Sequence, residues 1–208
     1  RSKNLVEAIN LMGSSPWGKT LAKLPEGANL QQMEDALDAA YYADALKSVS
    51  QPGSDFTLKR YLRCEIDHKN LINILRSIRQ GIDSEGIIQI MIPGGRSISK
   101  EVLRAMARET TGIGAVETLT KKSQGFDSEG LMQATEASDG GSLDPVIQLL
   151  AKKRDALLYS MSHRSPVSVL PVVHYIESKT HEVQNLRLLV RGKAAGLSNE
   201  AIEEHMRR

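Results

Sequence analysis

The stretch that decides the fold of this chain is Val183-Gln184-Asn185-Leu186-Arg187-Leu188-Leu189-Val190-Arg191-Gly192-Lys193-Ala194-Ala195-Gly196. A related stretch occurs earlier, as Lys69-Asn70-Leu71-Ile72-Asn73-Ile74-Leu75-Arg76-Ser77-Ile78-Arg79-Gln80-Gly81. Matching residues are separated by 115 positions, as in the pairs Asn70 and Asn185, Leu71 and Leu186, Arg76 and Arg191, Gly81 and Gly196. A repeat this long predicts a duplicated domain, because solenoid units span only about 20–50 residues.

The composition favours an all-α protein with two small domains. The chain has 208 residues, 40% of them hydrophobic and 25% charged, as in ordinary globular proteins. Aromatic residues make up only 4%, and the remaining apolar residues are mostly aliphatic, which suits helical bundles. We therefore expect two tandem duplicated helical-bundle domains over residues 14–110 and 111–208. Residues 1–13 are expected to be the tail of a preceding repeat, since Leu5, Ile9 and Met12 share one helical face.

Several classes of function are disfavoured by composition. The net charge of +2, with no basic run interleaved with aromatic residues, argues against nucleic-acid binding. Cys64 is the single cysteine, so no internal disulfide can form. No apolar run reaches the roughly 18 residues of a membrane-spanning helix.

Apolar spacing and capping residues predict the helices along the chain. They are expected over 4–12, 17–24, 29–51, 56–79, 83–92, 97 or 99 to 108, 112–120, 144–161, 166–196 and 199–208. Residues 123–141, rich in Gly and small polar side chains, give no clear signal. In the helix over 166–196, an apolar seam forms from Val173, Ile176, Val183, Leu186 and Val190.

Two patterns suggest chemistry but lack essential parts. His181-Glu182-Val183-Gln184-Asn185 resembles a zinc-protease helix, but Asn185 stands where the second histidine ligand belongs. Residues 94–100, Gly94-Gly95-Arg96-Ser97-Ile98-Ser99-Lys100, suggest a phosphate-binding loop, yet the P-loop spacing and a preceding strand are absent, so a loop-to-helix turn is the better interpretation.

The remaining candidates are weaker. Cys64 has no base with an orienting partner beside it, and Glu65 and Asp67, two residues apart on a helix, face different directions. We therefore predict no catalytic residue, no cofactor site and no metal site.

The repeated polar residues are interpreted as structural motif candidates: Asn70, Arg76, Asn185, Arg187 and Arg191. Asparagine is unfavourable within a helix, yet it recurs at the same place in both copies. We expect each asparagine to bond the backbone at the end of a neighbouring helix, because buried polar groups need partners. The arginines are expected to pair with acids such as Glu34, Asp38 or Glu177. Truncation of Asn185 to Ala should then lower thermal stability.

The chain resembles the C subunit of archaeal and bacterial A/V-type rotary ATPases, which is related to the d subunit of the eukaryotic vacuolar enzyme. The resemblance rests on residues 166–179, Pro166-Val167-Ser168-Val169-Leu170-Pro171-Val172-Val173-His174-Tyr175-Ile176-Glu177-Ser178-Lys179, followed by Asn185-Leu186-Arg187, Arg191-Gly192-Lys193 and Ala195-Gly196-Leu197. Glu34-Asp35-Ala36-Leu37-Asp38, Tyr41-Tyr42 and Glu65-Ile66-Asp67 support it. Gln184 departs from the family, which often has Arg there.

This resemblance implies a mechanical role. The resemblance implies the fold of this family, in which three related helical domains form a funnel. The chain would contain the second and third of these domains. It would be a non-catalytic central-stalk protein, peripheral on the cytoplasmic side of the membrane, that links the membrane rotor ring (c/K subunits) to the shaft made of the D and F subunits. Neither a small-molecule substrate nor a nucleic acid is implied.

Two other hypotheses stay open at this stage. A generic helical-repeat adaptor protein of the cytosol would also fit the duplication, and it would bind different partners. A helical metalloenzyme using His174 and His181 would show metal-dependent activity.

Overall fold

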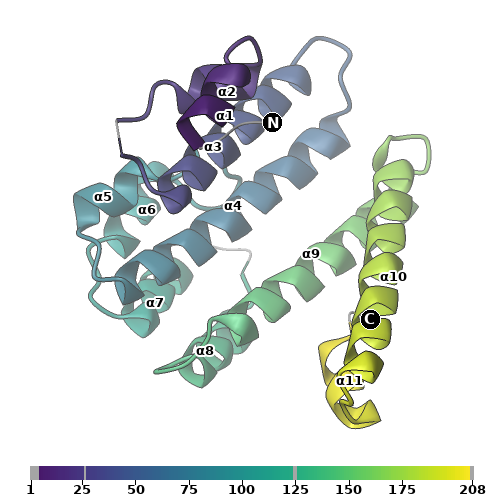
Figure 1. Ribbon diagram of the computed structural model, residues 1–208. Helices are drawn as coiled ribbons and strands as arrows, with labels where there is room; N and C mark the ends of the chain where they lie inside the picture. The colour runs from purple at the N-terminus through teal and green to yellow at the C-terminus, as the bar shows by residue number, and fades with distance from the viewer. Residues whose placement is uncertain (1–4, 26, 124–125, 207–208) are drawn as a thin grey trace. The chain divides into compact units, whose positions relative to one another are not determined.

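Every regular element in the described part of the chain is an α-helix. The computed structural model describes residues 5–25, 27–123 and 126–206. The helices are α1 (Leu5–Leu11), α2 (Pro16–Leu21), α3 (Leu30–Ser48), α4 (Phe56–Arg79), α5 (Ser84–Gln89), α6 (Lys100–Met106), α7 (Gly112–Lys122), α8 (Ser128–Ala137), α9 (Asp144–Arg164), α10 (Leu170–Ala194) and α11 (Asn199–His205) (Figure 1). The predicted all-helical class is confirmed.

Packing divides the chain into two compact units, residues 1–155 and 156–208. Helix α9 contributes its first part to unit 1 and its last part to unit 2. The sequence predicted a duplication with limits at 14–110 and 111–208. Packing units do not test whether two segments arose by duplication, so these limits stay a prediction.

Helix α4 is the central helix of unit 1, and it has the limits that the sequence predicted. Asp55 caps its start by accepting hydrogen bonds from the N–H groups of Thr57 (2.8 Å) and Leu58 (3.4 Å). Gly81 ends it with a positive φ of 69°, which the absence of a side chain permits. Ten residues of the helix are buried, which makes α4 the main support of the unit.

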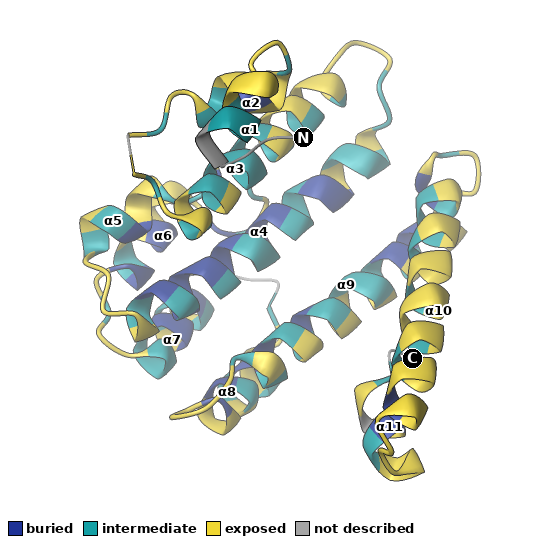
Figure 2. Cartoon of the chain, viewed as in Figure 1, coloured by how far each residue is buried: buried dark blue, intermediate teal, exposed yellow. Residues whose placement is uncertain are grey.

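The core of unit 1 forms where α4 meets α5 to α8 and the start of α9 (Figure 2). Its buried members are Leu71, Ile74, Leu75, Ile87, Ile98, Val102, Leu103, Met106, Ala107, Ala115, Val116, Leu119, Leu131, Val146 and Leu150. A single core thus joins residues on both sides of position 110.

Helix α3 packs against α4 and has no buried residue of its own. It begins with a capping box, in which Asn29 and Gln32 exchange hydrogen bonds of 2.8 and 2.9 Å. Helix α3 therefore contributes no buried residue to the core of unit 1.

Helix α8 was not predicted. It occupies 128–137, within the segment that gave no clear sequence signal. Asp127 caps it by accepting from the N–H of Gly130 (3.1 Å), and Lys153 on α9 pairs with the same carboxylate at 2.8 Å. The helix depends on burial of Leu131 and Thr135 in the core, a tertiary effect that local propensity does not report.

In unit 2, α10 and α11 meet closely at Gly192. A Cβ at this position would lie 2.8 Å from the Ile202 Cγ1, so only glycine allows this approach without a shift. Gly196 ends α10 with a φ of 75°, and the N–H of Leu197 donates to the carbonyl of Gly192 (2.9 Å). Leu170 and Ile202 are buried in this unit.

The apolar seam predicted on α10 is not buried in the structure. Ile176, Val183, Leu186 and Val190 are all exposed, and α10 is mostly yellow in Figure 2. Helical periodicity indicates an apolar face, but burial needs a second element that packs on that face.

No helix in the described ranges is both long and apolar enough to cross a membrane.

Candidate functional site: polar side chains of the two long helices

The carboxylate of Asp67 on α4 accepts three backbone hydrogen bonds from one loop. Its oxygens receive the N–H groups of Arg96 (2.9 Å), Ser97 (2.6 Å) and Ile98 (3.1 Å). Only 2% of Asp67 is exposed. Burial raises the pKa of this carboxyl, and the three backbone N–H donors oppose that rise. Asp67 thus fixes the loop that leads into α6.

Two glycines let this loop approach α4. A Cβ on Gly95 would overlap the Oδ1 of Asp67, and Gly94 has a positive φ of 103°. Arg63, one turn before Asp67, donates to the carbonyl of Gly94 (3.1 Å) through Nε and to that of Gly95 (2.8 Å) through Nη2. The backbone amides that suggested phosphate binding are therefore bonded to an internal carboxylate.

Asn70 makes a paired contact with the backbone of Ile92. Its Nδ2 donates to the Ile92 carbonyl, and its Oδ1 accepts from the Ile92 N–H, both at 2.8 Å. Asn70 is fully buried, so both amide groups are satisfied within the protein. This contact holds the chain just after α5, as expected for an asparagine within this helix.

The two arginines near the end of α4 behave differently. Arg79 donates to the carbonyls of Ser138 and Gly141, which fixes the loop between α8 and α9. Arg76 was expected to pair with Glu34 or Asp38, and this is wrong. Among the described residues Asp38 pairs with Lys69 at 2.6 Å, and Arg76 reaches no carboxylate within 4.0 Å.

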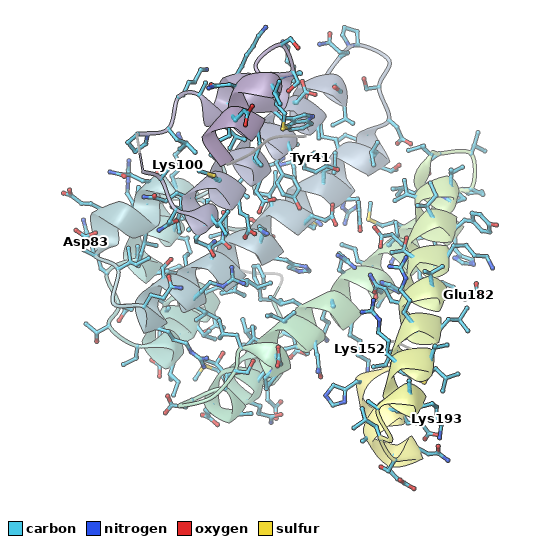
Figure 3. The ribbon with its side chains drawn as sticks, viewed as in Figure 1. Tyr41, Asp83, Lys100, Lys152, Glu182 and Lys193 are labelled. Atoms are coloured by element: carbon cyan, nitrogen blue, oxygen red, sulfur yellow. The ribbon has the colours of Figure 1, made fainter. Side chains whose placement is uncertain are left out.

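The matching residues of α10 lie in a different environment. Asn185 is half-buried and lines a shallow hollow of about 390 Å³ with His181 and Leu186. Arg187 and Arg191 are exposed. Glu182, which corresponds in position to Asp67, projects outward from α10 (Figure 3) and pairs with Lys179 at 2.6 Å.

His174, His181 and Cys64 each contact different neighbours within their own unit. His174 lies edge-on to Tyr159, with ring centroids 5.6 Å apart, and His181 Nε2 lies 4.0 Å from a Glu177 oxygen. Cys64 Sγ has the Arg96 guanidinium at 3.8 Å. In the described ranges no three His, Cys, Asp or Glu side chains gather in a way that could hold a metal ion.

Sequence reasoning missed Arg63, Asp67 and Arg79 as anchors of the loops. Arg63, Asp67 and Asn70 follow one another at helical spacing, so a polar stripe within an otherwise buried helix was the available signal. The arrangement as a whole provides mechanical support, because each side chain bonds backbone groups of a loop distant in sequence.

Comparison with known proteins places these features in a family. The family described as "ATP synthase (C/AC39) subunit" matches residues 1–205. The chain is similar to the C subunit of the A-type ATP synthase of Methanococcoides burtonii, with 31% identity over 95% of this chain and 54% of that protein. The corresponding protein of Methanosarcina barkeri is 31% identical over 98% of this chain and 54% of its own length. That of Archaeoglobus fulgidus is 30% identical over 98% and 57%.

The chain spans about half the length of these relatives. No solved structure matches the chain with significance.

Proposed function

Because the chain belongs to the ATP synthase (C/AC39) subunit family, we propose that it is a segment of the C subunit of an A-type ATP synthase. Its role is then non-catalytic. It forms part of the central stalk and transmits torque between the membrane rotor ring of c/K subunits and the shaft made of the D and F subunits. The family match over residues 1–205 is the observation that carries this proposal.

The internal bonding of unit 1 suits a part that transmits force. Three side chains of α4, those of Asp67, Asn70 and Arg79, bond backbone groups of segments 22 to 62 residues away. Such contacts resist local opening, since the loops cannot move without breaking these hydrogen bonds, of which those of Asp67 to Ile98 and of Asn70 to Ile92 are buried. A torque coupler needs stiff connections of this kind more than it needs a reactive site.

The proposal includes the duplication of residues 14–110 and 111–208, with 1–13 as the tail of an earlier repeat; residues 1–4 lie outside the described ranges. Matched structural features support it. Gly81 and Gly196 both have positive φ, and the next helices are capped by Asp83 and Ser198. Ile87 and Ile202, again 115 positions apart, are both buried.

We place the protein on the cytoplasmic side of the membrane as a peripheral part of the complex. It would bind the ring through surfaces of its own and would contribute no spanning segment from the described ranges, where no helix is apolar enough.

Association with a purified D–F subcomplex tests this function. The full chain and D–F are mixed at moderate salt and separated on a sizing column, with an unrelated helical protein of similar size in place of D–F as control. We expect co-elution in one-to-one proportion with D–F alone. The assay is repeated with the full-length protein, since the chain spans about half of its relatives. Lack of co-elution with D–F in both forms would overturn the rotor assignment and favour the adaptor hypothesis.

A further inference from the structure

Helix α10 carries a row of exposed apolar side chains along one side. They recur at steps of three, four and seven residues, which places them on one face of the helix, here called the α10 face. The row consists of Val172, Ile176, Val183, Leu186 and Val190, each between 45% and 67% exposed. Folded proteins in water rarely expose so continuous an apolar row, and such a patch marks a surface that another element or molecule covers.

The repeat indicates which element belongs on this face. Moved by 115 positions, α4 would span 171–194 and α5 would span 199–204. These limits agree closely with those of α10, Leu170–Ala194, and of α11, Asn199–His205. In unit 2 the counterparts of α4 and α5 are therefore α10 and α11. Helices α6 and α7 follow α5 in unit 1, and the described residues of unit 2 contain no helix that corresponds to them.

In unit 1, α7 packs on α4. Leu71 and Leu75 of α4, the counterparts of Leu186 and Val190, are both buried in the core that α7 shares. A Cβ on Gly112, the first residue of α7, would lie 3.4 Å from the Cδ2 of Leu75, so α7 begins in contact with this leucine. The buried side of α7 then continues with Ala115, Val116 and Leu119. Unit 1 thus contains the helix that is missing over the α10 face.

We propose that the α10 face is covered by a helix equivalent to α7, which belongs to the part of the full-length protein outside this chain. The chain spans about half the length of its relatives, so the full-length protein has room for such a helix. The helix should present small and aliphatic side chains, as α7 does, because α10 offers valine and leucine at the matching positions. The inference rests on the duplication and on the longer protein that the proposed function includes.

The first test compares the reaction rate of a thiol on the α10 face in two proteins. Leu186→Cys is made in this chain and in the full-length protein, each with Cys64→Ser, and iodoacetamide alkylation is followed without D–F. We expect alkylation at least about tenfold slower in the full-length protein, because a covered thiol reacts only when the packing opens locally. Val190→Cys, on the same face, provides a second reporter in case one substitution disturbs the packing.

Gln184→Cys is the matched control. Gln184 is exposed, and its position two residues before Leu186 places it on a different side of α10. Its alkylation rate should agree within about twofold between the two proteins, since the proposed helix covers only the α10 face.

The second test identifies the covering element. Arg187, one residue after Leu186, is exposed at the edge of the α10 face. A benzophenone photo-cross-linker is attached to the thiol introduced by Arg187→Cys in the full-length protein with Cys64→Ser, and mass spectrometry identifies the peptide to which it bonds. We expect a bond within one molecule to a peptide from outside residues 1–208.

Three results would overturn the proposal. Equal alkylation rates of Leu186→Cys and of Val190→Cys in the two proteins would mean that the rest of the full-length protein leaves the face uncovered. A cross-link to residues 1–208 of the same molecule would mean that this chain covers the face itself. A cross-link between two molecules would make a second copy the occupant. All of these measurements are made without D–F, so their outcome and that of the D–F association assay are independent.

Discussion

Helices α4 and α10 carry the same sequence pattern but differ in what covers them. Leu71, Ile74 and Leu75 of α4 are at most 1% exposed, whereas their counterparts Leu186, Leu189 and Val190 on α10 are 55%, 38% and 67% exposed. The segment from α5 to α7 packs over α4, while α11 is the element that packs on the end of α10 in unit 2. An amphipathic pattern therefore reports a capacity for burial, and the neighbouring elements decide whether burial occurs.

The largest difference between the helices is expected for their leucines. Leu71→Ala should lower the free energy of unfolding by about 3–4 kcal/mol, because it leaves a cavity in a closed core. Leu186→Ala should lower it by less than about 1 kcal/mol, since more than half of that residue already contacts solvent. Urea denaturation of both variants measures the two values. Equal losses would mean that the α10 face is buried in solution.

The second difference concerns the acids at matching positions. Asp67→Asn should cost about 3 kcal/mol, because three backbone N–H donors lose a charged acceptor and an amide N–H₂ group faces them. Glu182→Gln should leave stability unchanged within error, since its exposed ion pair with Lys179 contributes little. Thermal melting of the two variants checks this pair, and a stable Asp67→Asn protein would refute the role of Asp67 as loop anchor.

The asparagines should differ by a smaller amount. Asn70→Ala removes both bonds to Ile92 and leaves a buried N–H and carbonyl unsatisfied, for a loss of about 2 kcal/mol. Asn185→Ala should also destabilise, but by less, because Asn185 is half-buried and solvent can replace part of its bonding. Hydrogen exchange at the Ile92 amide gives an independent measure, and it should accelerate in Asn70→Ala alone.

The smallest effect is a pH dependence at His68, whose counterpart on α10 is Val183. Burial, with a smaller effect from the positive charge of Arg154, lowers the pKa of His68 to about 4. Between about pH 6.5 and pH 4, His68 is therefore protonated in the unfolded chain but neutral in the folded chain. Protonation stabilises the unfolded chain, so the free energy of unfolding decreases as the pH falls through this range.

His68→Val should remove that dependence. Between pH 7 and pH 5 the wild type should lose about 1–2 kcal/mol relative to this variant, a range that follows from the shifted pKa and the partial exposure of the ring. The difference between the two proteins isolates His68 from Asp35 and Asp67, which are common to both. Parallel pH profiles would show that His68 titrates normally in the folded state.

Local signals predicted much of the fold. Apolar spacing after Phe56 and the glycine at Gly81 gave the limits of α4, and the helix start expected at residue 29 is the capping residue of α3. These features act within four residues of chain, so a single sequence contains them. Helix α8 was missed because its stability comes from residues packed against it and not from its own composition.

The candidate site was predictable only in part. The repeated asparagine marked Asn70 as a residue with a structural partner, but the identity of Ile92 depends on a loop 22 residues away. The polar stripe of Arg63, Asp67 and Asn70 could be seen in the sequence, but nothing local reveals that Gly94 and Gly95 approach it. The prediction of an acid partner for Arg76 was wrong for the same reason. The packing of α3 against α4 places Asp38 beside Lys69, and Asp38 pairs with Lys69 and not with Arg76.

The contact between Asp67 and the loop before α6 also affects how this loop responds to dissolved anions. Its three amides form a site with the geometry for an anion, and Asp67 fills that site permanently as part of the same molecule. To bind these amides, dissolved phosphate or nucleotide would have to displace the Asp67 carboxylate. That carboxylate belongs to the same chain, so its effective concentration at the amides is high. In the role proposed above, within an ATP synthase, we therefore expect this loop to be insensitive to the concentrations of ATP and phosphate.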